Sequence, residues 1–188
     1  MDIYEQIKNY TPFNEQEEKD KQVLLDCLEK YDNIFLRDNK LAHFTVSAWI
    51  VNKDRTKVIM AYHNIYNSWS WLGGHADGET DLLKVAVKEA KEESGAENIK
   101  VVSSDIFSLE TVTVDGHIKK GEYVSSHLHL NVTYLLEADE NEALKKCEGE
   151  NSAVSWFGLT EAIEMSNEPW FKENIYTKLN AKLRSLSV

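Results

Sequence analysis

Residues 73–79 read GGHADGE, and residues 88–95 read KEAKEESG. The first stretch is a glycine-rich loop, and the second belongs to a helical pattern. Glu89, Glu92 and Glu93 are spaced i, i+3 and i+4, so they project from one face of that helix. Like charges on one face repel each other, and a divalent cation would relieve that repulsion. The sequence therefore predicts a site for Mg²⁺ or Mn²⁺, which bind oxygen ligands together with substrate phosphates.

The acidic helix is expected over about residues 81–94, with Gly95 as its C-terminal stop. Four apolar residues follow helical spacing and should face the core: Leu83, Ala86, Val87 and Ala90. The carboxylates then lie beside the buried stripe, at its edge.

Strand patterns surround this helix on both sides. Runs rich in β-branched or alternating apolar residues predict strands at 43–51, 57–63, 99–102, 106–114, 124–137 and 154–157. Helical spacing predicts further helices at 14–31, 160–166 and 170–186. The first two strands should form a hairpin, and Asp115-Gly116 is a second hairpin signal.

The whole chain has 188 residues and a formal net charge of −11 at pH 7. One domain with an appendage is expected at this length. The acidic balance argues against stable nucleic-acid binding, which needs a basic surface, and a bound metal must supply positive charge for an anionic substrate. Cys27 and Cys147 have no metal-binding or redox spacing, which favours reduced thiols in a cytoplasmic protein. No apolar run approaches the length of a membrane span.

The loop and helix together resemble the Nudix box. The family pattern is Gly, five residues, Glu, seven residues, then Arg-Glu-hydrophobic-x-Glu-Glu-x-Gly-hydrophobic, and residues 88–96 match its second half. Lys88 replaces the family arginine, and its point-like ammonium cannot reproduce a forked guanidinium contact. Gly73 and Glu79 keep the first spacing, whereas eight residues rather than seven separate Glu79 from Lys88.

The resemblance implies both a fold and an activity. The implied fold is the α/β Nudix fold, an α/β/α sandwich around a mixed β-sheet over residues 42–188, with residues 1–41 as an N-terminal helical extension. The implied activity is that of a pyrophosphohydrolase, which cleaves the diphosphate bridge of a nucleoside diphosphate linked to another moiety. The expected partner is thus a small molecule, without stable nucleic-acid or membrane binding, and a homodimer is compatible with the sequence.

The resemblance also assigns roles residue by residue. Glu92 and Glu93 match the family's metal ligands, and Glu89 matches a third ligand or a general base. A carbonyl of Gly73 or Gly74 would complete the metal sphere, because glycine permits close backbone approach. Gly74 is also a candidate for contact with the substrate.

Other loop residues receive more open assignments. Lys88 is expected to orient a metal-binding glutamate, and Glu79 to steady the loop through Lys88 or through backbone donors. The family sometimes takes its base from a later loop, where Glu150 is preferred over Glu148. His75 is a candidate for contacting the substrate or orienting the loop, with a solvent-facing loop histidine as the alternative.

His127 and His129 lie two residues apart and share one face of a predicted strand. That spacing is compatible with a metal site. The same face carries Asn131 and Thr133, so a polar strand face is the preferred interpretation.

Two other functions remain open. A non-catalytic Nudix-like sensor would bind the same ligand without turnover, although it has no need for the clustered carboxylates. An enzyme like isopentenyl diphosphate isomerase would need a catalytic cysteine, and neither Cys27 nor Cys147 is placed for that role. The sequence does not identify which nucleotide derivative is the substrate.

Overall fold

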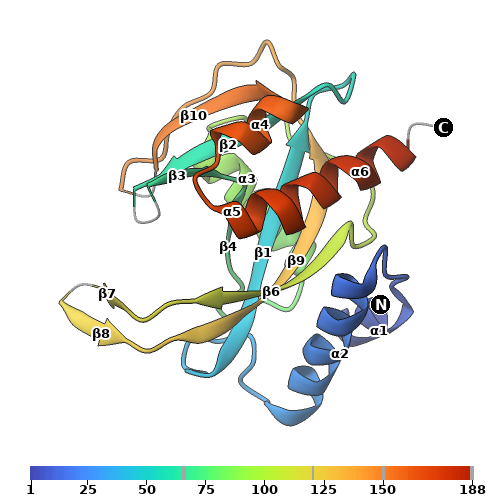
Figure 1. Ribbon diagram of the computed structural model, residues 1–188, viewed down its shortest axis with the longest axis vertical. Helices are drawn as coiled ribbons and strands as arrows, with labels where there is room; N and C mark the ends of the chain where they lie inside the picture. The colour runs from blue at the N-terminus through green and yellow to red at the C-terminus, as the bar shows by residue number, and fades with distance from the viewer. Residues whose placement is uncertain (65–66, 120, 150, 187–188) are drawn as a thin grey trace.

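The computed structural model describes residues 1–64, 67–119, 121–149 and 151–186. In this part of the chain a mixed, curled eight-stranded sheet has the order β10-β2-β1-β9-β5, with β3 on β2, β4 on β1 and β6 on β9 (Figure 1). Its strands are β1 (Ala42–Val51), β2 (Lys57–His63), β3 (Ser68–Ser70), β4 (Leu72–His75), β5 (Lys100–Val101), β6 (Ser108–Val114), β9 (His127–Glu137) and β10 (Asn151–Gly158). Strands β7 (His117–Lys119) and β8 (Glu122–Val124) form a separate two-stranded arm.

Helices cover both faces of the sheet. They are α1 (Ile3–Asn9), α2 (Glu15–Lys30), α3 (Leu82–Ser94), α4 (Leu159–Met165), α5 (Pro169–Phe171), the π-helical turn η1 (Lys172–Tyr176) and α6 (Thr177–Ser185). One core cluster joins apolar side chains of α1, α2 and α3 to the sheet, and the other joins α4, η1 and α6 to its opposite face. The expected α/β/α sandwich around a mixed sheet is confirmed.

Strands β1 and β9 run parallel through the middle of the sheet, with His43 beside His129 and Thr45 beside Asn131. Every residue of β1 is buried, as expected for a central strand covered on both faces. Alternate side chains point to opposite faces. Consequently Phe44 and Val46 enter the α3-side core, whereas His43 and Thr45 face the other way.

The hairpin predicted from the first two strands is confirmed by the antiparallel pairing of β1 and β2. The turn predicted at Asp115-Gly116 is wrong. The chain instead continues into the β7–β8 arm, where Lys119 pairs with Glu122. A Cβ at Gly116 would lie 2.2 Å from the hydroxyl of Tyr123, the end of an exposed side chain that can move aside.

The C-terminal run predicted as a single helix is three consecutive helical segments, α5, η1 and α6. Thr177 donates its amide proton to the carbonyl of Lys172, the i→i+5 bond of a π turn. Pro169 begins α5 at a position where a proline is tolerated.

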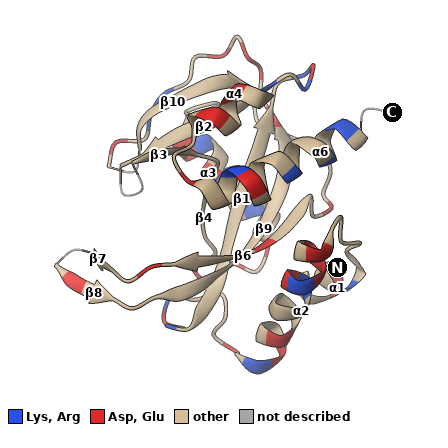
Figure 2. Cartoon of the chain, in the orientation of Figure 1, with Lys and Arg blue, Asp and Glu red and all other residues tan. Residues whose placement is uncertain are grey.

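The N-terminal helices are joined to the domain by buried charges. α2 presents both acidic and basic residues, and α6 presents basic ones (Figure 2). Glu17 of α2 and Glu110 of β6 are fully buried and form ion pairs with lysines of α6. Lys178 pairs with both carboxylates, and Lys182 pairs with Glu17. The closest of these ion pairs joins Lys182 Nζ to Glu17 Oε1 at 2.7 Å. The boundary at residues 41 and 42 stays a prediction, but α1 and α2 share a core with the sheet.

Among the described residues, none of the helices has the length and apolar character needed to cross a membrane.

Candidate functional site

The glycine strand β4 pairs with β1 along one edge and packs against α3. A Cβ at Gly73 would lie 2.1 Å from the carbonyl oxygen of Val46, so this position admits no side chain. A Cβ at Gly74 would lie 2.6 Å from the carboxyl carbon of Glu89. Gly73 is therefore required because backbone approaches it closely, whereas at Gly74 only the flexible side chain of Glu89 would have to shift.

Glu93 is fixed against this strand. Glu93 is only 3% exposed, and its Oε2 accepts a hydrogen bond from the Gly73 amide at 2.9 Å. Asn151 Nδ2 donates to the carbonyl oxygen of Glu93 at 3.1 Å. The expectation that all three carboxylates lie at the edge of the buried stripe is wrong for Glu93. The buried face of α3 includes Glu93 itself, because Leu82 and Val85 are buried on the same side of the helix.

Lys88 bridges the two remaining carboxylates of α3. Its Nζ lies 3.0 Å from Glu89 Oε1 and 3.0 Å from Glu92 Oε2. These hydrogen bonds raise the pKa of Lys88 above its ordinary value, so the ammonium stays charged. Among the described residues, Glu89, Glu92 and Glu93 are not placed as a group that could hold one metal ion. A shared cation therefore requires these side chains to rearrange.

Glu79 steadies the loop, although not through Lys88. It accepts hydrogen bonds from the amides of Thr80 and Asp81 at 3.0 and 3.1 Å, as the expectation of backbone donors requires. Its ammonium partner is Lys84 at 2.6 Å. Lys84 lies in the first turn of α3, directly beside the loop, whereas Lys88 is one turn further along.

The loop before β10, which was expected to supply a general base, brings none to the site among the residues that the structure describes. Glu150 lies outside the described residues, and Glu148 is exposed to solvent. The assignment of a general base to this loop stays a prediction.

A cavity of about 720 Å³ opens on the other face of β4. Its lining includes Gly73, Gly74 and His75 of β4, Thr45 of β1 and Asn131 of β9. None of the three α3 carboxylates is among the described residues that line it. The glycine strand thus separates the cavity from the acidic helix.

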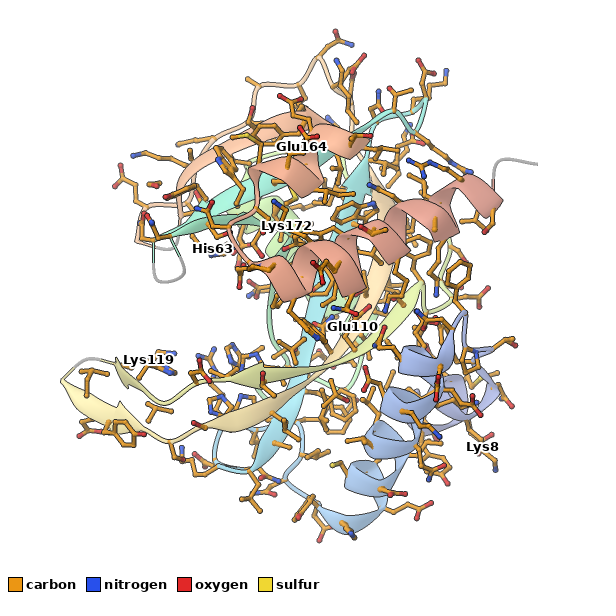
Figure 3. All side chains as sticks on the ribbon, in the orientation of Figure 1. Lys8, His63, Glu110, Lys119, Glu164 and Lys172 are labelled. Atoms are coloured by element: carbon orange, nitrogen blue, oxygen red, sulfur yellow. The ribbon has the colours of Figure 1, made fainter. Side chains whose placement is uncertain are left out.

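Positive side chains line the same cavity. Arg37, Lys40 and Lys119 do so and outnumber the acidic lining residues, Asp115 and Glu168, which offsets locally the acidic balance of the chain. His63 at the end of β2 and Lys119 on the arm reach it from different elements (Figure 3). The cavity is therefore suited to an anionic ligand.

Four histidines gather at this cavity. The His43 ring centroid lies 5.2 Å from that of His75, 4.9 Å from that of His127 and 5.0 Å from that of His129. The in-register pairing of β1 with β9 places His43 beside His129, and β4 adds His75. The interpretation of His127 and His129 as part of a polar strand face agrees with the structure, in which Asn131 and Thr133 hydrogen-bond to each other and to Glu110. It missed two further histidines, His43 and His75, because they come from strands far away in the sequence.

Burial makes these imidazoles poor bases. Burial lowers the pKa of His43, and burial together with the charge of Arg37 lowers the pKa of His75 to about 3. Burial, with His75 and His43 nearby, lowers the pKa of His129 to about 2. These three rings are neutral near pH 7. The alternative of a solvent-facing His75 is wrong, because the ring faces its histidine neighbours at the cavity.

For the hydrolytic activity that the resemblance implies, replacing Gly74 by alanine is expected to lower the rate roughly ten- to a hundredfold while preserving the fold. The added Cβ would displace the Glu89 carboxylate, the flexible end of a side chain rather than backbone. Steady-state kinetics and a thermal melt of the same protein sample test this. A large drop in melting temperature, or unchanged activity, would contradict it.

The chain is similar to known proteins in sequence pattern and in fold. A family model described as NUDIX domain matches residues 41–179. No curated protein matches the chain. A NUDIX-family hydrolase from Clostridium perfringens is 23% identical, with a TM-score of 0.53 over 77% of this chain and 97% of that one.

Two further solved structures share the fold. An ADP-ribose pyrophosphatase from Streptococcus suis is 17% identical, with a TM-score of 0.52 over 77% of this chain and 92% of that one. The NUDIX domain of NrtR from Shewanella oneidensis, complexed with ADP ribose, is 16% identical, with a TM-score of 0.53 over 87% and 97%. At these identities the likeness shows the fold alone.

Proposed function

The chain belongs to the NUDIX domain family, and from this premise we propose that it is a metal-dependent hydrolase that cleaves the diphosphate bridge of a nucleoside diphosphate linked to another moiety. Family membership confirms the predicted family and the class of pyrophosphohydrolase. The metal requirement and the substrate remain proposals.

One observation carries the proposal. The Gly73 amide donates to Glu93, and Glu89 packs against Gly74, so the acidic helix is held directly against the strand that walls the cavity. Attack on a diphosphate bound in the cavity requires that its negative charge be offset. A cation held by the acidic helix would have to be near the diphosphate to do this.

The residues of α3 fit a hard divalent cation by their chemistry. NUDIX proteins generally use such ions, and carboxylate and glycine carbonyl oxygens are the donors that Mg²⁺ and Mn²⁺ prefer. Glu89, Glu92 and Glu93 would hold the ion, with a carbonyl of Gly73 or Gly74. When bound, the ion would neutralise phosphate charge and lower the pKa of water.

The side chains themselves have defined tasks in this scheme. The Gly73 amide fixes the orientation of Glu93, and Lys88 keeps Glu89 and Glu92 close despite their like charges. The base that takes the proton of the attacking water is proposed to be Glu89 or Glu150.

The cavity is proposed to hold the nucleoside diphosphate part. Its volume and the lysine and arginine side chains in its lining suit an anionic, drug-sized molecule. Gly74 and His75 are the proposed substrate contacts. A panel of substrates with Mg²⁺ tests this: ADP-ribose, nucleotide sugars and dinucleoside polyphosphates, assayed by release of mononucleotide. Absence of turnover across the panel in the presence of Mg²⁺ and Mn²⁺ would contradict the proposal.

Replacing Lys88 by arginine is expected to retain or improve activity. A guanidinium fork can contact Glu89 and Glu92 with separate N–H groups, whereas the ammonium is one point charge shared between them. The kcat/KM of Lys88→Arg relative to the wild type, with Lys88→Gln as the uncharged control, checks this. A large loss in Lys88→Arg would show that the site is built specifically around lysine.

The sensor alternative is favoured by one observation. The α3 carboxylates have partners within the protein and do not converge within metal-binding distance among the described residues. Tight ligand binding by calorimetry, without turnover in the panel above, would decide for a sensor. The isomerase alternative lacks support, because no cysteine is among the described residues that line the cavity. A cytoplasmic location and a homodimer remain proposals.

A further inference from the structure

We propose that His43, His75 and His129 form a binding site for a transition metal ion of the Zn²⁺ class, separate from the carboxylates of α3. One ring nitrogen of each residue lies within 4.8 Å of the others. The three residues come from β1, β4 and β9, three strands that pair side by side. The sheet itself, rather than a flexible loop, brings them together.

The spacing suits coordination after a small contraction. A zinc ion with nitrogen ligands at 2.0–2.1 Å in a tetrahedral arrangement separates those nitrogens by about 3.4 Å. One nitrogen of each ring already lies within 4.8 Å of the others, so the contraction needed is on the order of 1 Å. His127 Nε2 lies 3.3 Å from His129 Nε2, which places a fourth imidazole at the border of the site.

His43 supplies a second, independent observation. It is 5% exposed, and its Nε2 is buried without a hydrogen-bond partner among the described residues. Its Nδ1 lies 3.1 Å from the carbonyl oxygen of Asn39. Because a carbonyl oxygen only accepts hydrogen bonds, the proton belongs on Nδ1 and the lone pair on Nε2. A ligating histidine commonly has this arrangement, with its second nitrogen held by a carbonyl.

An orphaned buried acceptor is costly. A buried polar atom without a partner destabilises a fold, because it has given up its hydrogen bonds to water and gained none in return. Coordination of a metal by His43 Nε2 would remove that cost.

One positive charge near the cluster is partly offset. Arg37 donates from Nε to Asp77 Oδ1 at 2.6 Å, and a second nitrogen contacts Oδ2 of the same carboxylate. Asp77 thus reduces the repulsion that Arg37 exerts on a bound cation.

The donor set selects the class of ion. Imidazole nitrogens suit zinc, copper, nickel and iron, whereas Mg²⁺ prefers oxygen ligands and retains its waters. Three protein ligands leave a tetrahedral ion with an open position. All three histidines line the cavity, so that position would be available to an oxygen of the bound ligand.

The two metal sites would lie on different sides of β4. The side chain of His75 contributes to the cavity, whereas Glu89 packs against Gly74 from α3. Neighbouring residues of a strand point to opposite faces, which explains the separation. The inference does not depend on the hydrolase proposal, because binding of metal is measured without turnover.

The test uses Co²⁺ as a spectroscopic probe on chelator-treated protein without an added histidine tag. We expect the wild type to retain one equivalent of cobalt through gel filtration, with visible absorption typical of nitrogen ligation. Zn²⁺ should displace the cobalt, and a large excess of Mg²⁺ should not. Absence of retained cobalt in the wild type would overturn the proposal.

Variants locate the site. We expect His75→Gln and His129→Asn each to weaken cobalt binding at least tenfold. His63→Ala removes a histidine outside the trio and Glu92→Gln removes an α3 carboxylate, and both should bind as the wild type does. Thermal melts with chelator establish that each variant is folded, and Zn²⁺ should raise the melting temperature of the wild type but not of the two trio variants. Undiminished binding in both trio variants, or loss in Glu92→Gln alone, would place the ion elsewhere.

Discussion

Replacing Glu93 by glutamine is expected to reduce kcat/KM roughly a hundredfold or more, equivalent to about 2.7 kcal/mol of transition-state stabilisation. The glutamine carbonyl oxygen can still accept the hydrogen bond from Gly73, so the buried contact with β4 is retained. The substitution therefore removes negative charge with little change of shape. The loss follows because a neutral amide is a much weaker ligand for a divalent cation than a carboxylate.

The measurement is steady-state hydrolysis of the best substrate of the panel across a titration of Mg²⁺. Glu92→Gln should show a loss of similar size. Glu97→Gln, an exposed carboxylate just beyond the end of α3, is the matched control and should behave as the wild type. Unchanged activity in both Glu92→Gln and Glu93→Gln would refute the assigned roles.

Replacing Glu17 by glutamine is expected to lower the free energy of unfolding by about 3–5 kcal/mol. Glu17 is fully buried and accepts hydrogen bonds from Lys182 Nζ at 2.7 Å, Ser108 Oγ at 2.7 Å and the Phe13 amide at 2.7 Å. A neutral amide leaves the charge of Lys182 without its closest anion. A buried charge that loses its partner costs more than the intact pair contributed.

Urea denaturation of both proteins at pH 7 measures this difference. Glu18→Gln is the matched control, because Glu18 is the next residue of α2 and is exposed. It should change the free energy of unfolding by no more than about 0.5 kcal/mol. A loss below about 1 kcal/mol in Glu17→Gln would show that water or repacking compensates the buried lysine.

The same carboxylate predicts an acid dependence of stability. Burial by itself raises the pKa of Glu17, but Lys178 and Lys182 outweigh burial and lower the pKa to about 2. The folded-state pKa is thus below the unfolded value of about 4.3. A depressed pKa gives stability that is fully present above the unfolded value and is lost as the pH falls toward the folded one. The wild type should lose this contribution between about pH 4 and pH 2, and Glu17→Gln should not.

The sequence by itself determined the acidic helix and its loop. Spacing i, i+3 and i+4 placed the carboxylates on α3, and Gly95 ends that helix in the left-handed conformation with φ 70°. Boundaries of the first two strands were also predictable, since alternation and β-branching act over a few residues. These features are local, because helix capping and periodicity depend on neighbours in the chain.

Only the tertiary structure decided which faces meet. The partners of Glu17 come from the last helix, and His43 meets His129 because β1 and β9 pair in parallel with one particular register. A shift of one residue in that register would turn either histidine to the opposite face. Contacts of this kind are set by packing between distant segments, which leaves no periodic signal in the sequence of either segment.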